Sequence, residues 1–163
     1  MIAVLLNPNF PSIETQTREL QSAAHALGQP IQIFTAGSER ELDAAFESMR
    51  QLRVGALLVG SDIFFASRRT QIVTLAARHS VPAVYEQRAF VEAGGLMSYG
   101  TSITDAHRQF GLYTGRVLNG EKPDDLPIMQ STKFELVINL STATAFALTV
   151  SPMLLARADE VIE

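Results

Sequence analysis

Polar side chains follow four short apolar runs of this sequence, at the points where the runs end. In an open parallel sheet, ligands bind beyond the carboxyl ends of the strands, so residues in these places could bind a small molecule. Taken singly, each could also cap a helix or fill a turn, but as a group they favour a binding site. They mix amide, hydroxyl, carboxylate and aromatic groups, which suits a small polar solute with an aromatic or apolar part. The candidate ligand-binding residues are Asn7, Asn9, Ser61, Asp62, Phe64, Tyr85, Glu86 and Tyr99.

Sequence motifs for catalysis and for cofactors are absent. There is no GxGxxG after the first apolar run, no GxxxxGK[ST] and no GxSxG. The chain has no cysteine, and His25, His79 and His107 lie on separate predicted helices without the spacing of metal ligands. We therefore expect no cofactor, no metal and no enzymatic activity. Asp62 and Glu86 leave one alternative open, because a pair of carboxylates can perform acid–base chemistry, although carboxylates also recognise ammonium groups.

Composition and charge narrow the class of protein further. With 163 residues, 47% hydrophobic and 18% charged, the chain is long enough for a domain with its own core. A net charge of -4 and scattered basic residues argue against nucleic-acid binding. No run approaches the ~18 apolar residues of a membrane span. Residues 1–6 lack the basic start and the length of a secretory signal, so the chain as written would stay in the cytoplasm.

Strand-like runs alternate with helical patterns through the first 100 residues. Serine and glutamate at Ser38 and Glu41 form a capping box at the start of one such helix. Alternation at this spacing predicts an α/β fold, a Rossmann-like parallel sheet of about five strands with helices on both faces. We expect residues 1–100 to form the ligand-binding lobe. The predicted strands cover residues 2–6, 31–34, 55–60, 82–85 and 96–99.

The pattern changes in residues 101–163. A helix is predicted over 104–119, followed by a polar linker over 121–127 that contains two prolines. Alternating apolar residues over 134–139 predict a strand with one less buried face. Short helices are predicted over 141–146 and 152–162. We expect this part to pack on the same lobe or on a partner chain.

Several segments together resemble a known family. The match extends over essentially the whole chain, and it is most specific from Gly94 onward. It rests on residues 7–9 (NPN), 60–65 (GSDIFF), 94–100 (GGLMSYG), 115–123 (GRVLNGEKP), 132–139 (TKFELVIN) and 154–160 (LLARADE). In these segments the sequence resembles the ABC-transporter substrate-binding proteins, whose members include tryptophan-binding types.

The resemblance implies one lobe of a type I periplasmic binding protein. In such proteins two Rossmann-like lobes close on a ligand, and a membrane permease recognises the closed form. It further implies a periplasmic location and a small-molecule ligand, an amino acid or a small aromatic acid. The sequence matches the second lobe, and we expect neither a signal peptide nor a first lobe in this chain. The ligand-facing loops of that lobe correspond here to Asn7, Asn9, Ser61, Asp62, Tyr85 and Tyr99.

Two other function classes remain open, and we also expect the chain to form a dimer. An effector-sensing domain of a regulator has the same lobe architecture, although no helix-turn-helix precedes Met1, and a flavodoxin-like enzyme would use Asp62 and Glu86. In the family, the segment around 100–120 returns to the first lobe. Without that lobe, the apolar face of the 104–119 helix would be exposed, and exposed apolar patches favour association. We expect a homodimer in which the Phe110 face is buried by the other chain.

Overall fold

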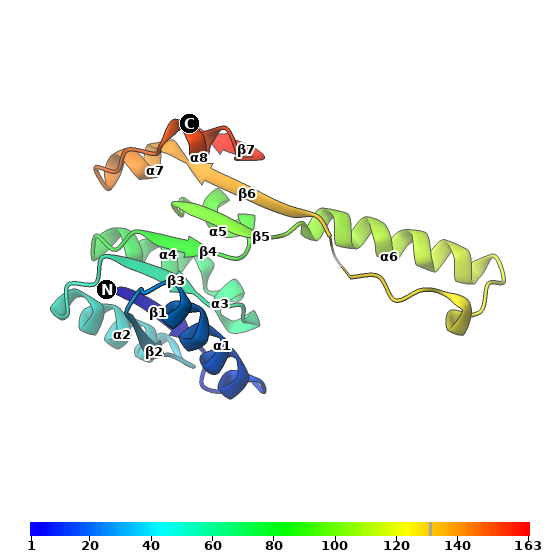
Figure 1. Ribbon diagram of the computed structural model, residues 1–163, viewed down its shortest axis with the longest axis horizontal. Coiled ribbons are helices and arrows are strands. Elements are labelled where there is room, and N and C mark those ends of the chain that lie inside the picture. The colour runs from blue at the N-terminus through cyan, green and yellow to red at the C-terminus, as the bar shows by residue number, and fades with distance from the viewer. Residues whose placement is uncertain (131) are drawn as a thin grey trace.

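The computed structural model of the protein describes residues 1–130 and 132–163. Seven strands of the described residues form a sheet in the order β2-β1-β3-β4-β5-β6-β7 (Figure 1). The first five strands run parallel to one another, which confirms the predicted sheet. They are β1 (Ile2–Leu6), β2 (Ile31–Thr35), β3 (Ala56–Val59), β4 (Ala83–Tyr85) and β5 (Met97–Thr101).

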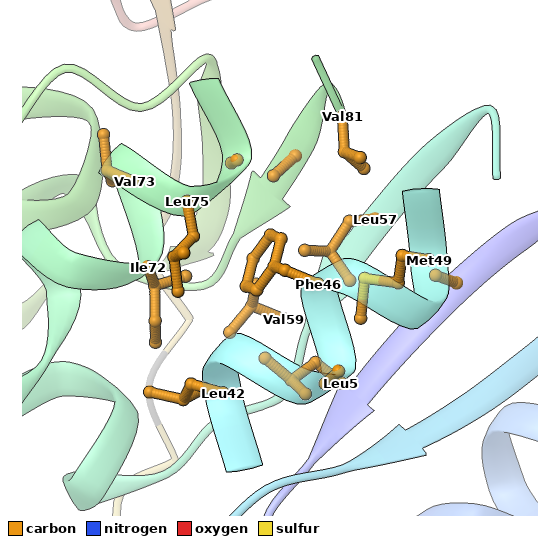
Figure 2. Packing of buried hydrophobic residues seen from close by; sticks show 14 of the residues in the cluster. Leu5, Leu42, Phe46, Met49, Leu57, Val59, Ile72, Val73, Leu75 and Val81 are labelled. Carbon is orange, nitrogen blue, oxygen red and sulfur yellow. The ribbon is translucent and has the colours of Figure 1, made fainter. Parts of the chain in front are cut away.

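Helices lie on both faces of this sheet. One face carries the main core, under α2 (Glu39–Gln51), α4 (Arg69–Arg78) and α5 (Arg88–Glu92). In Figure 2, Phe46 of α2 lies at the centre of this core, between Leu57 and Val59 of β3 and Ile72 of α4. On the other face, α1 (Ile13–Ala26) lies over Val4 and Leu58. The apolar spacing that predicts α1, α2 and α4 therefore reflects their packing against the sheet, whereas α5 was not predicted.

The capping box predicted at the start of α2 is present in a modified form. Ser38 Oγ accepts a hydrogen bond from the Glu41 N–H at 3.4 Å. The Glu41 carboxylate reaches back one residue further than the usual pattern and accepts from the Gly37 N–H at 2.7 Å. Two free amides at the start of the helix are thus satisfied, and the loop after β2 is held in place.

The second part of the chain begins with an arm. Helix α6 (Ile103–Leu118) leaves the end of β5 and projects away from the sheet, and residues 119–130, which include the short 3-10 helix η1 (Pro123–Asp125), run back beside it (Figure 1). We call α6 and residues 119–130 the arm. None of the 16 residues of α6, all of them described, is buried. The predicted helix thus exists, but it contributes nothing to the core of the lobe.

The chain then rejoins the sheet. Strand β6 (Phe134–Asn139) pairs antiparallel with β5, and β7 (Glu160–Ile162) pairs parallel with β6. Two short helices, α7 (Leu140–Ala145) and α8 (Pro152–Leu155), connect these strands. The prediction of less burial on one face of β6 is wrong, because burial rises along the strand instead of alternating. Its first residue is exposed beside the arm, whereas Val137 and Ile138 lie deep between β5 and β7.

The helix predicted over 152–162 is also wrong beyond residue 155. Asp159 turns the chain into the sheet, because its Oδ2 accepts from the Leu136 N–H at 2.7 Å and its own N–H donates to the Leu136 carbonyl at 2.9 Å. The spacing of Ile72, Leu75 and Ala76 predicts one further helix, over residues 67–79. The structure contains α3 (Ile63–Ser67) and then α4, with Arg68 at the junction.

Candidate ligand-binding site

The carboxyl ends of β1, β3 and β4 meet at one edge of the sheet, and Asn7, Asp62 and Glu86 lie just beyond them. Asn7 Nδ2 donates a hydrogen bond to Asp62 Oδ1 at 3.0 Å, and Asn7 Oδ1 accepts from the Asn9 N–H at 2.9 Å. Asp62 Oδ1 also accepts from the Phe65 N–H at 3.2 Å and caps α3. These hydrogen bonds join the loops after β1 and β3 into a fixed polar rim.

Two glycines allow the neighbouring loops to approach this rim. A Cβ atom at Gly37, after β2, would lie 2.5 Å from Asn9 Nδ2 and 3.3 Å from Asn7 Oδ1. A Cβ atom at Gly100, in β5, would collide with the Glu86 carbonyl oxygen and lie 2.9 Å from Glu86 Cγ. Any larger residue at either position would displace a side chain or backbone group of the site.

A small pocket opens between the loops that follow β3 and β4. The space in it that a water-sized group can occupy is only about 10 Å³. Both Asp62 and Glu86 line it, and Glu86 Oε2 is buried without a hydrogen-bond partner among the described residues. A buried carboxylate oxygen without a donor is unfavourable, so this atom marks a place where a ligand could donate a hydrogen bond. The lining residues are Val59, Gly60, Ser61, Asp62, Ala66, Glu86, Gln87 and Phe90.

Basic side chains near this edge are already paired. Arg88, two residues after Glu86, contacts Glu92 at 2.8 Å, Glu160 at 2.7 Å and Glu135 at 3.5 Å. The hydrogen bonds that the Arg88 guanidinium donates to the Glu92 and Glu160 carboxylates raise its pKa above the usual value. The positive charge of Arg88 is therefore balanced by carboxylates of α5, β6 and β7, and not by those of the pocket.

The structure places the remaining predicted residues differently. Tyr85 is only 1% exposed, and its ring stacks on Phe90 with centroids 4.6 Å apart. Burial raises the pKa of its phenol. Because successive residues of a strand point to opposite faces, Tyr85 enters the core while Glu86 reaches the edge. A ligand at this edge would not reach the Tyr85 ring.

The other two aromatic residues predicted to bind the ligand lie beside the rim and not within it. Tyr99 is 61% exposed, but its ring stacks on Phe134 with centroids 5.9 Å apart, near the base of the arm. Phe64 is half-buried and packs against the core. Asn9 and Ser61 are exposed at the edge, next to Asn7 and Asp62. The structure therefore brings together Asn7, Asn9, Ser61, Asp62 and Glu86.

Sequence reasoning missed Gly37 and Gln87. Gly37 stands shortly after the second predicted strand, which was a usable signal, since glycine there permits close approach of neighbouring groups. Gln87 lines the pocket but carried no sequence signal of its own. Among the described residues, no group of three or more His, Asp or Glu side chains is placed to hold a metal ion. No helix in the described part of the chain has the length and apolarity needed to cross a membrane.

The arm carries a second hollow of different character. It encloses about 1130 Å³, including open space, between α6 and the returning residues. Tyr113 Oη donates to the Pro127 carbonyl at 2.7 Å and holds the two segments together. The lining is almost entirely apolar, so this groove offers few groups that could orient a polar solute. Its main lining residues are Phe110, Tyr113, Val117, Leu118, Leu126, Ile128 and Met129.

The lobe is an open, mostly parallel α/β sheet, and its polar rim and pocket lie at the carboxyl ends of the strands. Folds of this class bind small molecules at that edge. The family of ABC transporter substrate binding proteins matches residues 1–162, and the chain belongs to this family. No curated protein sequence matched the chain.

Solved structures share this fold. An ABC domain from Streptococcus pneumonia in complex with L-Trp is 27% identical, with a TM-score of 0.85 over 99% of this chain and 56% of that one. A conserved domain protein from Vibrio cholerae is 22% identical, with a TM-score of 0.85 over 98% and 54%. The ligand-free, open structure of a substrate binding protein with adhesive properties from Clostridium difficile is 20% identical, with a TM-score of 0.72 over 99% and 54%. The chain spans about half the length of these structures.

Proposed function

We propose that this chain is a ligand-binding lobe of the substrate-binding component of an ABC uptake transporter. It binds a small amino acid or aromatic solute and carries out no reaction on it. The observation that carries this proposal is the Asn7–Asp62 hydrogen bond, which joins the ends of two parallel strands beside the Glu86 pocket. The L-Trp complex of a 27% identical relative supports a ligand of this kind.

The proposed contacts are Asn7, Asn9, Ser61, Asp62 and Glu86. They lie within residues 1–100, to which we assign ligand binding, while residues 101–163 supply the arm and the remaining strands. A rim that is already hydrogen-bonded favours binding, because little ordering is needed when the ligand arrives. Tyr99 and Phe64 would contact only a ligand that extends beyond the rim.

Family membership supports a second lobe, a periplasmic location and a permease as parts of the proposal. The solved relatives contain about as much chain again beyond the matched part. Closure of a second lobe over this edge would enclose the ligand, as in hinged binding proteins. We propose a periplasmic location and an ABC permease as the partner that receives the solute.

Isothermal calorimetry with the full chain tests the proposal. The titrants are L-tryptophan, other amino acids and small aromatic acids. We expect heat of binding from at least one of them, and weaker binding of the same compound after Asn7→Ala. Ala44→Ser, on the exposed side of α2, is a control that should leave binding unchanged. Absence of heat from every compound, together with absence of NMR amide shifts when each is added to the labelled chain, would contradict a binding role for this chain.

We also propose that a second copy of the chain covers the arm. Phe110 is 67% exposed, Leu118 81% and Ile128 99%, and no part of the lobe covers them. Exposed apolar faces of this kind favour association. The arm leaves the sheet from the end of β5, at the same edge as the site, so whatever covers the arm also faces the site. A copy of the chain is about as long as the part of the relatives that this chain does not match.

A further inference from the structure

We infer that the pocket between the loops after β3 and β4 takes the positively charged amino group of the ligand. The lobe would then select solutes that carry an amine over aromatic acids that lack one. This inference rests on the proposed function, which leaves both kinds of solute open.

The hydrogen bonds of the two carboxylates support this assignment. Asp62 Oδ1 already accepts from Asn7 Nδ2 and from the Phe65 N–H, so Oδ2 is the oxygen left for a ligand. Glu86 Oε2 is buried and has no donor among the described residues. An ammonium group brings three donors and a positive charge, and can therefore satisfy both carboxylates at once.

The charges around the pocket independently support its assignment to the amino group of the ligand. The residues that line the pocket include two carboxylates and no lysine or arginine. The nearest arginines along the chain are engaged elsewhere, Arg88 with three glutamates and Arg68 with Glu39 at 2.8 Å. A ligand carboxylate placed here would meet two like charges, which disfavours it.

The size of the pocket points to a part of the ligand and not to the whole. The space open to a water-sized group is about 10 Å³, far below the ~300–1,000 Å³ of pockets that enclose a complete small molecule. It is close to the ~10–15 Å³ that a single water needs, so it has room for one group of that size, such as an ammonium, and no more. The apolar part of the ligand would then lie outside, over the rim and toward the second lobe or copy.

Three indole compounds separate the amine from the acid. They are L-tryptophan, tryptamine, which has no carboxylate, and indole-3-propionate, which has no amine. We expect tryptophan and tryptamine to bind and indole-3-propionate to bind at least about tenfold more weakly, as a lost charged hydrogen bond produces. Calorimetry measures the affinities, and NMR amide shifts of the labelled chain detect binding too weak for calorimetry.

Two conservative variants test the assigned groups. Glu86→Gln and Asp62→Asn remove a charge but keep the shape of the side chain, and an asparagine at 62 retains an Oδ1 that can accept from Asn7 and Phe65. Each should weaken tryptamine binding about tenfold or more and leave indole-3-propionate unchanged or tighter. Asp43→Asn, at an exposed position of α2, is the matched control and should change neither affinity. Thermal unfolding confirms that each variant is folded.

The possible results distinguish the inference from the proposed function. Binding of indole-3-propionate as tight as that of tryptamine would overturn the inference and leave the binding function standing. The same conclusion follows if tryptamine binds the folded Glu86→Gln and Asp62→Asn variants as tightly as the original chain. If none of the three compounds, nor any other amino acid or aromatic acid, binds by either method, both the inference and the proposed function are overturned.

Discussion

Asp62 serves both the stability of the lobe and the geometry of its site. Through one oxygen it caps α3 and holds the side chain of Asn7. Loss of a cap costs about 0.5–2 kcal/mol, and the buried Asn7 amide left without its acceptor adds to this. The two roles can be separated because asparagine offers the same acceptor without the charge.

We therefore expect Asp62→Ala to lower the free energy of unfolding by about 1–3 kcal/mol, and Asp62→Asn to lower it by less than about 1 kcal/mol. Urea unfolding followed by circular dichroism measures both. Equal destabilisation by the two substitutions would show that the Oδ1 hydrogen bonds do not hold this edge together.

Gly37 determines how closely the loop after β2 approaches the site. A methyl group there would lie 2.5 Å from Asn9 Nδ2, the end of an exposed side chain, and 3.3 Å from Asn7 Oδ1, so the Asn9 side chain must swing away from the rim. We expect Gly37→Ala to weaken ligand binding severalfold and to lower the free energy of unfolding by less than about 1 kcal/mol, because an exposed side chain moves at little cost. Gly111→Ala is the control, because nothing lies within 4 Å of that position on α6. Alanine in a helix should be neutral or stabilising there. Unchanged affinity in a folded Gly37→Ala variant would remove this loop from the site.

At the scale of elements, β7 depends on contacts from far along the chain. Its three residues pair with β6, and Glu160 binds Arg88 of α5, which also contacts Glu135 of β6. A network of this kind stabilises more than an isolated surface pair, which contributes ~0–1 kcal/mol. Arg88 thus links three elements that are distant in sequence.

We expect Arg88→Ala to increase hydrogen exchange of the β7 amides about tenfold while the amides of β1 and β3 keep their protection. Arg50→Ala provides the comparison, since Arg50 pairs with Glu47 on its own helix. Its effect should be confined to α2. Unchanged protection of β7 in the Arg88 variant would show that strand pairing alone holds the C-terminal segment.

The elements also show what the sequence could predict. Helix α2 and strands β1 and β3 were predictable, because apolar period and capping residues act locally and agree with the packing. Strand β7 was not, because its pairing with β6 is supported by contacts of Asp159 with Leu136 and of Glu160 with Arg88, none of which is apparent from local spacing. The site shows the same division. The ends of strands identified Asn7 and Asp62, but only the pleat of β4 decides that Glu86 reaches the edge and Tyr85 the core.

At the scale of the whole molecule, the arm determines what the lobe can associate with. Its apolar residues are exposed along α6 and the returning segment, and the Tyr113–Pro127 hydrogen bond keeps the two together. A mass measured by light scattering should be about twice the 17.8 kDa of one chain at micromolar concentration. A monomer under these conditions would contradict the proposed pairing.

We expect Phe110→Glu to shift the dimer to monomers, because a charge would have to be buried at the interface. The lobe should remain folded, since α6 contributes no buried residue to it. Leu27→Glu is the control, as Leu27 is equally exposed but lies at the end of α1, away from the arm. Dissociation by both variants would indicate general repulsion between chains and not an interface on the arm.

The central claim is that a small solute binds at the joined carboxyl ends of β1, β3 and β4. An NMR titration of the isotope-labelled chain with L-tryptophan tests it most directly, because each backbone amide reports its own surroundings. We predict saturable shifts of the amides of Asn7 and Asn9 and of residues 60–62 and 86–88, with the amides of α2 and α4 unchanged. Shifts confined to the arm, or none up to millimolar tryptophan and the other amino acids, would contradict the account.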